Sequence, residues 1–305
     1  MIYHLYTTQG NRPYQEDVYV IKNYLSNDLS LTETENFSRL NVDLFGVFDG
    51  HGGGEISKTV SKTLPQYFYK QNMMNDNCPK PISKYTNYIV STFDNLQNDL
   101  NAKHSKSTLQ GTTVCVCIVY EFKGKKYITS MWAGDSRAIG CNQRLIAESL
   151  TLDHKPDMPL ERFRIQQLGG EITFEKNDVP RINGVLAVSR ALGDFDQKKY
   201  VEHKPDVNHY YCDYKFIVVA TDGLWDVMDN QMVCNIIYEN IINNPKILEC
   251  NKTKKSETNI ATKLAEKAIE LGSDDNITII IYFLDTNIND YIKYINKPSD
   301  DIKNI

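Results

Sequence analysis

Two kinds of hydrophobic pattern alternate along the chain. Largely apolar runs are typical of buried strands, and they occupy residues 18–21, 44–48, 113–120, 127–133, 216–220 and 277–282. Between them, apolar residues recur every three or four positions, which predicts amphipathic helices at 56–64, 85–100, 233–237 and 260–271. The sequence shows no internal repeat and no linker that would divide the chain.

Capping and helix-breaking residues predict where several of these helices begin and end. Asp229 is a candidate N-cap for the helix through Val233, and Gly272 is expected to end the helix at 260–271. Pro65 is expected to kink or end the helix that contains Leu64, because proline lacks the N–H that a helix interior needs.

The segments between these elements are predicted to lie on the surface. Residues 22–43 are polar and predict a loop. Residues 153–183 predict an excursion over the surface, whose short helix through Leu160, Phe163 and Leu168 is stopped by the glycines at 169 and 170. After residue 285 the tail predicts one short helix through Ile288 and Ile295, before a proline at 298.

Composition narrows the classes of partner. The 305 residues are 41% hydrophobic, which is enough for a substantial core, and the net charge of −5 argues against nucleic acid and acidic membranes as partners. Seven scattered cysteines without a Cys-x-x-Cys pair suggest neither a disulfide framework nor a zinc site. No secretory signal or membrane-length apolar span is seen. We therefore expect a soluble, cytoplasmic protein, with nuclear residence left open.

Acidic residues recur at the ends of the predicted strands. Asp49, Asp135, Asp222 and Asp275 each lie where a strand begins or ends, and Glu16 and Asp17 flank a fifth strand. A single aspartate beside glycine is most often a turn residue, and the run from Asp49 to Gly54 could be a hairpin turn with an exposed histidine. Five such junctions instead favour a shared site. Clustered carboxylates repel one another unless cations neutralise them, and oxygen donors suit Mg²⁺ or Mn²⁺, so the pattern indicates a two-metal hydrolytic site.

Seven motifs in this order resemble the metal-dependent protein phosphatase family, type 2C. The resemblance covers about residues 10–283. The motifs are Arg12-x-x-Gln15-Glu16-Asp17, Phe48-Asp49-Gly50-His51-Gly52-Gly53, Gly111-Thr112-Thr113, Ala133-Gly134-Asp135-Ser136-Arg137, Leu186-Ala187-Val188-Ser189-Arg190-Ala191-Leu192-Gly193-Asp194, Ala220-Thr221-Asp222-Gly223-Leu224-Trp225-Asp226 and Asp275-Asn276-Ile277-Thr278.

The resemblance implies an α+β fold, a four-layer α-β-β-α sandwich of two antiparallel sheets packed face to face and flanked by helices. One catalytic domain is expected over residues 1–285. It would include a flap subdomain at about 154–183 and be followed by a short, helical tail at 286–305. The flap is longer than is usual in the family, which leaves peptide specificity open. The domain is expected to work as a monomer.

The resemblance also implies a metal-binding role for each acidic residue of the site. Asp49 would bridge two Mg²⁺ or Mn²⁺ ions, the Gly50 carbonyl would bind one of them, and Asp222 and Asp275 would hold the other. Glu16 would act through coordinated water with support from Asp17. Asp135, near Thr113, matches the position of a weaker third metal, although it could equally cap a turn.

The implied reaction is attack of a metal-activated water on phosphorus, without a covalent phosphoenzyme. Arg12 would hold the phosphate oxygens and His51 would protonate the departing oxygen. Arg12 could instead pair with Glu16, and His51 could merely bond a ligand water. Asp194 is expected to be structural, Arg190 could brace the sheet, and His154 has no motif support as a ligand.

These expectations define a protein serine/threonine phosphatase that acts on phosphoserine and phosphothreonine in phosphorylated proteins. The first alternative is a catalytically weak phosphatase-like scaffold that binds a partner, but such proteins lose metal carboxylates and this chain has them all. The second alternative is a hydrolase of a non-protein phosphate ester, which the resemblance alone disfavours.

Overall fold

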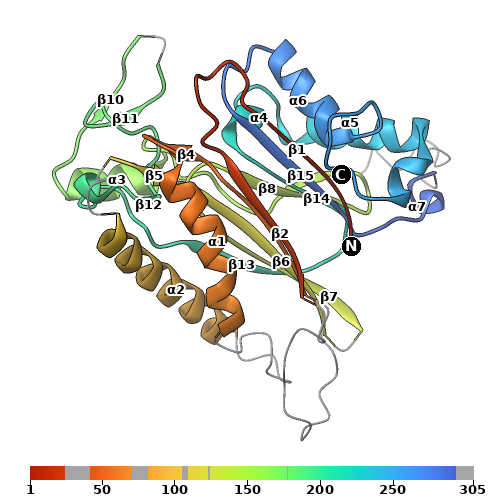
Figure 1. The fold of residues 1–305 in the computed structure, drawn as a ribbon, viewed down its shortest axis with the longest axis horizontal. Helices are drawn as coiled ribbons and strands as arrows, with labels where there is room; N and C mark the ends of the chain where they lie inside the picture. The colour runs from red at the N-terminus through yellow and green to blue at the C-terminus, as the bar shows by residue number, and fades with distance from the viewer. Residues whose placement is uncertain (25–41, 71–81, 105–108, 123, 177, 293–305) are drawn as a thin grey trace, which may run out of the picture.

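Two five-stranded antiparallel sheets form the centre of the protein (Figure 1). The computed structural model describes residues 1–24, 42–70, 82–104, 109–122, 124–176 and 178–292. The first sheet has the order β1 (Ile2–Thr8), β15 (Ile277–Phe283), β14 (Tyr214–Ala220), β8 (Arg137–Asn142) and β9 (Ala147–Ser149). The second has the order β13 (Asp206–Tyr211), β7 (Lys125–Ala133), β6 (Val114–Phe122), β3 (Val42–Phe48) and β2 (Val18–Tyr24).

Helices cover the outer face of each sheet. Helices α1 (Glu55–Lys70) and α2 (Ile82–Lys103) lie on the second sheet, and α4 (Asp222–Trp225), α5 (Asn230–Asn243), α6 (Ile260–Glu270) and α7 (Ile288–Ile292) lie on the side of the first (Figure 1). A 3₁₀ helix, η3 (Pro245–Glu249), joins α5 to α6. Of the separate buried apolar clusters, two lie between helices and a sheet and a third lies between the sheets. The predicted four-layer α-β-β-α sandwich is confirmed.

Most predicted elements are present, and three differ in extent. Pro65 lies inside α1, which continues to Lys70, because Leu64 and Phe68 on either side are fully buried and their packing outweighs the missing hydrogen bond. The predicted loop at 22–43 is shorter, since β2 reaches residue 24 and β3 begins at 42; residues 25–41 lie outside the described residues. The tail helix is α7, and the part of that prediction beyond Ile292 also lies outside them.

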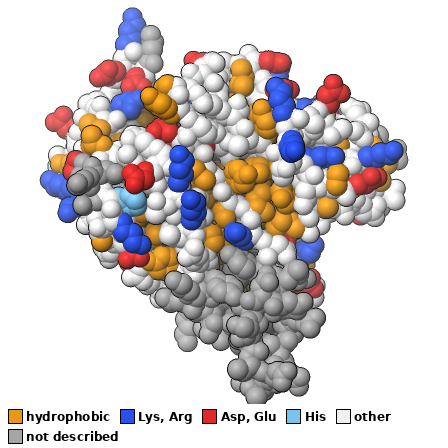
Figure 2. All heavy atoms as spheres, viewed as in Figure 1, with side chains coloured by type: hydrophobic (Ala, Val, Ile, Leu, Met, Phe, Trp, Pro, Cys, Tyr) orange, Lys and Arg blue, Asp and Glu red, His pale blue; other side chains and the backbone are white. Residues whose placement is uncertain are grey.

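A small three-stranded sheet closes one end of the sandwich. It consists of β12 (Leu192–Gly193), β5 (Gly111–Thr112) and β4 (Gly50–His51). Next to it, residues 154–183, the flap, contain α3 (Pro159–Gln167), β10 (Ile172–Thr173) and β11 (Arg181–Ile182). The β10–β11 hairpin projects from the body of the protein at the upper left of Figures 1 and 2. Among the described residues no helix is long and apolar enough to cross a membrane.

Candidate active site

Asp49 lies at the point where β3 passes into β4. The main chain on both sides of it is fixed to Thr113: the Asp49 N–H donates to Thr113 Oγ1 at 3.1 Å, and the Thr113 N–H donates to the Asp49 carbonyl at 2.8 Å. A Cβ atom at Gly50 would lie 2.6 Å from the Glu16 carbonyl oxygen and 2.7 Å from Ser57 Oγ, so only glycine allows this approach. The turn therefore holds Asp49 and Glu16 at one place.

The other predicted carboxylates reach the same place from different strands. Asp222 begins α4 directly after β14, Asp275 precedes β15, and Asp135 lies between β7 and β8. With Asp49 and Glu16 they line one cavity of about 550 Å³, which also contains Gly50, His51 and Arg12. Asp17 is the exception: it is buried outside this lining and accepts a hydrogen bond from Thr221 Oγ1 at 2.9 Å.

Burial and mutual repulsion make these carboxylates hard to ionise. Burial raises the pKa of Asp17 to about 7 and that of Asp222 to about 6, with further contributions from neighbouring carboxylates. Burial and then Asp222 raise the pKa of Asp49 and of Asp135 well above the usual range. Such a cluster is stable in its ionised form only when positive charge lies within it.

The donor set fits hard divalent cations. Asp17 Oδ1, Asp135 Oδ1 and Asp222 Oδ1 are buried and have no hydrogen-bond partner. Buried carboxylate oxygens without a donor are rare, and a cation is one partner that would satisfy them. Within the described residues, no three histidine, cysteine, aspartate or glutamate side chains already stand in a geometry that could hold an ion.

His51 is held by Asp194. His51 Nε2 lies 2.8 and 2.9 Å from the two carboxylate oxygens of Asp194, which is 1% exposed. Burial lowers the pKa of His51, but the charges of Asp194 and Glu16 and the hydrogen bond outweigh it, so the pKa is raised overall. A Cβ atom at Gly111 would lie 2.2 Å from Asp194 Oδ2 and 2.4 Å from His51 Nε2, so this pair requires glycine there.

Gln97 of α2 fixes the strand that carries Asp194. Its side-chain amide donates to the Gly193 carbonyl at 2.8 Å and accepts from the Gly193 N–H at 2.8 Å. Asp194 itself has a left-handed backbone with φ of 48°, which is unusual for a residue other than glycine. This orientation of Asp194 is therefore set by tertiary contacts, which sequence patterns do not reveal.

Arg12 lines the cavity and is half exposed. Its guanidinium Nη2 donates to Asp275 Oδ2 at 2.6 Å, so its partner here is the candidate metal ligand Asp275 and not Glu16. An exposed arginine can exchange such a partner for a phosphate at little cost, because exposed ion pairs contribute only about 0–1 kcal/mol. The position is compatible with the predicted phosphate contact.

The cavity also contains charged side chains outside the predicted set, and two of them form an ion pair. Lys155 Nζ lies 3.0 Å from Asp226 Oδ1, and both residues line the cavity. Burial lowers the pKa of Lys155, but the negative charges of Asp135 and Asp226 raise it by more, so the pKa of Lys155 is raised overall. Asp226 is part of the motif that contains Asp222, and Lys155 lies next to His154 in the chain. Nothing in the sequence pattern around either residue shows that Lys155 and Asp226 contact each other.

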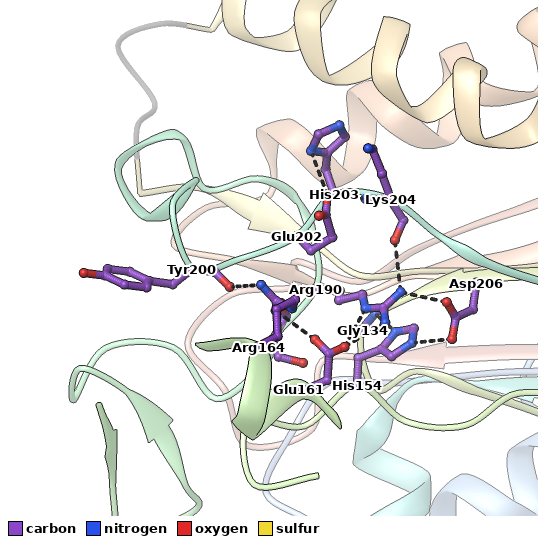
Figure 3. Close-up of polar contacts among 11 residues, drawn as sticks. Gly134, His154, Glu161, Arg164, Arg190, Tyr200, Glu202, His203, Lys204 and Asp206 are labelled. Atoms are coloured by element: carbon purple, nitrogen blue, oxygen red, sulfur yellow. Dashed lines mark hydrogen bonds and ion pairs between the residues drawn. The ribbon is translucent and has the colours of Figure 1, made fainter. Parts of the chain in front are cut away.

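His154 and Arg190 belong to a polar network under the flap (Figure 3). His154 Nδ1 accepts from the Gly134 N–H at 3.2 Å, and its Nε2 lies 3.2 Å from Asp206 Oδ2. Arg190 donates to Asp206 at 2.8 Å and to Glu161 at 2.7 and 3.0 Å. Arg190 thus ties the flap to β13, and His154 is a structural residue, in line with its lack of motif support.

A sandwich of two sheets with a carboxylate-lined cavity at one end is the arrangement of a metal-dependent phosphatase. The family model "Protein phosphatase 2C" matches residues 6–277 of the chain. The chain belongs to the protein phosphatase 2C family and is a serine/threonine protein phosphatase; members of this family are metal-dependent and act on phosphorylated proteins.

Individual relatives agree with this assignment. "Probable protein phosphatase 2C 59" of Oryza sativa subsp. japonica is 34% identical over 248 residues, covering 80% of this chain and 67% of that protein. "Probable protein phosphatase 2C 28" of Arabidopsis thaliana is 30% identical, covering 83% and 68%. The crystal structure of serine-threonine phosphatase 2C from Toxoplasma gondii is 25% identical, with a TM-score of 0.68 and coverage of 92% and 94%. A C. elegans sex determining protein, at 21% identity and a TM-score of 0.78, covers 96% and 67% and shows the shared fold.

Proposed function

We propose that the chain hydrolyses phosphoserine and phosphothreonine in proteins with two Mg²⁺ or Mn²⁺ ions held by Asp49, the Gly50 carbonyl, Asp222, Asp275 and, through water, Glu16. The observation that carries this proposal is the cavity on which five of the predicted carboxylates converge, two of which, Asp135 and Asp222, have a buried oxygen without a hydrogen-bond partner. Asp135 would bind a third ion with lower affinity, and Asp17 would support Glu16 from its position outside the cavity lining. When bound, the ions would neutralise the negative charge of the site and lower the pKa of the bound water that phosphoryl hydrolysis needs.

The chain's own residues would orient the substrate and move a proton. Arg12 would leave Asp275 and hold two phosphate oxygens with its planar guanidinium. Because Asp194 engages His51 Nε2, Nδ1 is left to give a proton to the departing serine or threonine oxygen. The buried carboxylate of Asp194 stabilises the imidazolium that this role requires.

Turnover of a phosphothreonine peptide, measured as phosphate release, tests the proposal. We expect release with Mn²⁺ or Mg²⁺, none in EDTA, and a loss of about 100-fold or more in Asp222→Asn. Asp229→Asn is the matched control, because Asp229 caps α5 and asparagine caps equally well. Absence of metal-dependent release from the native chain would leave the scaffold alternative.

The same variants separate lost chemistry from lost folding. Because the folded-state pKa of Asp222 is raised to about 6, its ionisation destabilises the metal-free protein as pH rises above 4 through 6. Asp222→Asn is therefore expected to increase the free energy of unfolding in EDTA at pH 7 by about 1–3 kcal/mol. Denaturant titration measures this, and Asp229→Asn should show no gain.

We also propose that residues 1–285 form one catalytic domain that acts as a monomer in the cytoplasm. The described cysteines support a reducing compartment, because Cys115, Cys117, Cys141, Cys212, Cys234 and Cys250 are all free. Acidic and basic side chains are scattered over the face in Figure 2, which is consistent with a protein that does not bind nucleic acid. Light scattering of the purified chain and imaging of a fluorescent fusion test the two parts separately.

A further inference from the structure

Helix α3 of the flap exposes two large apolar side chains to solvent. Leu160 is 82% exposed, Phe163 is 63% exposed, and Leu168, just beyond the helix, is 40% exposed. The buried residues of the helix are Glu161 and Ile165. An isolated exposed leucine needs no explanation, but two large apolar side chains on one helix and a third just beyond its end mark a contact surface.

Ion pairs hold the helix in this orientation. Figure 3 shows Glu161 pointing into the protein toward Arg164 and Arg190. Glu161 contacts Arg190 at 2.7 Å and Arg164 at 2.8 Å, and Arg164 also donates to the carbonyls of Ser189 and Tyr200 at 3.0 and 2.7 Å. Turning the apolar side inward would bury Leu160 and Phe163 but would break this network, which leaves buried charge unpaired. The exposed side is therefore a fixed surface, already ordered before any partner arrives.

A groove of about 460 Å³ lies beside this apolar side. Phe163, Leu168 and Val201 give it apolar walls, and Lys198, Lys199 and Glu202 give it charged ones. Its volume falls within the range of ligand sites, but the apolar stripe continues past it to Leu160, so the surface suits a chain segment better than a small molecule.

The charge of the groove favours an acidic occupant. Lys198 is exposed, and no ion pair to Lys198 or Lys199 is found within the described residues; Lys199 contacts the neighbouring Tyr200, whose hydroxyl lies 3.4 Å from Lys199 Nζ. Glu202 is already engaged, since it accepts from the Lys204 N–H at 3.1 Å and lies 3.4 Å from His203. The accessible charge is therefore positive, next to an apolar wall.

We propose that this groove docks an acidic segment with a large apolar side chain, located on a phosphoprotein substrate away from its phosphorylated residue. The proposal rests on the proposed phosphatase function. The groove and the catalytic cavity share one stretch of chain, because Val188 lines the cavity and the next residue, Ser189, binds Arg164 of the groove. A substrate held in the groove would thus keep its phosphorylated residue at high local concentration near the cavity.

Binding of a fluorescein-labelled peptide, Glu-Asp-Glu-Phe-Glu-Leu-Asp-Glu, tests the surface directly by fluorescence anisotropy. We expect saturable binding that weakens about tenfold or more in Phe163→Ser and in Lys198→Glu. Tyr211→Ser, which changes an aromatic residue that is 59% exposed on β13, is the matched control and should bind normally. No saturable binding, or equally tight binding of a peptide with lysine at every acidic position, would overturn the proposal.

Kinetics separate docking from catalysis. A phosphothreonine peptide is joined to the acidic segment by a Gly-Ser linker of about 10–20 residues and compared with the unextended peptide. The extension should lower KM in the native chain and not in Phe163→Ser, with kcat unchanged. Hydrolysis of p-nitrophenyl phosphate should be the same in all variants; if it is absent even from the native chain, the proposed function fails instead.

A second copy of the chain is the competing occupant of the groove. Sedimentation of the native chain and Phe163→Ser over a range of concentrations distinguishes it. Dimerisation that is lost in Phe163→Ser would overturn the substrate-docking proposal, whereas a monomer in both cases supports it.

Discussion

At the scale of single residues, the contact between Asp194 and His51 explains the most chemistry. A histidine in a glycine-rich turn is free to rotate unless something holds its ring. Asp194 provides that restraint with both oxygens, and it is held in turn by the Gln97 contacts to Gly193. Asp194 is thus a positioning residue for the proposed proton donor.

Asp194→Asn should therefore slow substrates according to their leaving groups. Phenyl phosphate, whose departing oxygen needs a proton, is expected to lose about 100-fold or more in kcat, while p-nitrophenyl phosphate should lose much less. Asp196→Asn, an exposed carboxylate two residues away, is the control. Equal slowing of both esters would show that Asp194 serves folding or another step.

Five of the six predicted carboxylates line the cavity, but the partners of the site residues could not be predicted from the sequence. Asp49, Asp222 and Asp275 could be predicted because each ends or begins an apolar run, a pattern visible in the sequence. The contacts of Asp194 with His51 and of Lys155 with Asp226 join residues 143 and 71 positions apart. Such pairs depend on how the loops at the sandwich end pack together, which hydrophobic periodicity does not encode.

At the scale of elements, long and strongly patterned segments were predicted well. Strands β14 and β15 and helix α6 match their apolar patterns, and Asp229 caps α5 by accepting from the Met232 N–H at 2.8 Å. Strand β9 was missed because it has only three residues, β1 and β13 because they are only partly buried, and β8 because its buried run, residues 138–141, is short. The spacing of Leu160, Phe163 and Leu168 predicted α3 correctly, but not that ion pairs would turn this side outward.

Helix α6 depends on a buried histidine, which gives the fold a pH dependence. His4 of β1 accepts from the Ile260 N–H through Nδ1 at 3.0 Å and donates from Nε2 to the Ile247 carbonyl at 3.2 Å. The first bond needs an unprotonated Nδ1 and therefore the neutral ring, whereas the Nε2–H can donate in either charge state. Burial lowers the pKa of His4 from 6.5 to about 4, so the unfolded chain binds a proton there at a higher pH than the folded chain does.

The contribution of His4 to the free energy of unfolding should accordingly be at its full value above pH 6.5 and fall by about 3 kcal/mol as pH drops toward 4. Urea titrations of the native chain and His4→Gln between pH 7 and 4.5 measure it as the difference between the two proteins, because the cavity carboxylates, Asp222 among them, contribute with the opposite sign in both. The native chain should be the more stable of the two at pH 7, and its advantage should shrink as pH falls. A difference that stays constant with pH would show that His4 does not cause the dependence.

At the scale of the whole molecule, helix α7 seals the far side of the first sheet over a buried cation. Lys215 of β14 is 1% exposed; its Nζ donates to the Asp290 carbonyl at 2.9 Å and lies 3.7 Å from Asp285 and 4.8 Å from the ring centre of Tyr291. Asp290 and Tyr291 belong to α7, so the sandwich relies on this short helix to stabilise the buried positive charge of Lys215.

Deleting residues 288–305 should destabilise the protein by about 3–5 kcal/mol, because it removes partners of a buried charge. The effect of Lys215→Met on the free energy of unfolding should have opposite signs in the two proteins. In the full chain the substitution should be destabilising, because α7 loses its contact with Lys215. In the deleted chain it should be stabilising, because it removes a buried charge that has lost its partners. Denaturant titration of the four proteins measures both effects. If the effects of the deletion and of Lys215→Met on the free energy of unfolding simply add in the doubly changed protein, α7 acts independently of Lys215.

The position of β15 also determines when the protein can become active during its synthesis. β15 pairs with both β1 and β14, and it is the last strand of the described chain. Until it leaves the ribosome, β1 has no neighbour in its sheet and Asp275 has not reached Asp49. A nascent chain therefore carries an incomplete set of carboxylates until β15 has been synthesised, and catalytic competence arrives only with that strand.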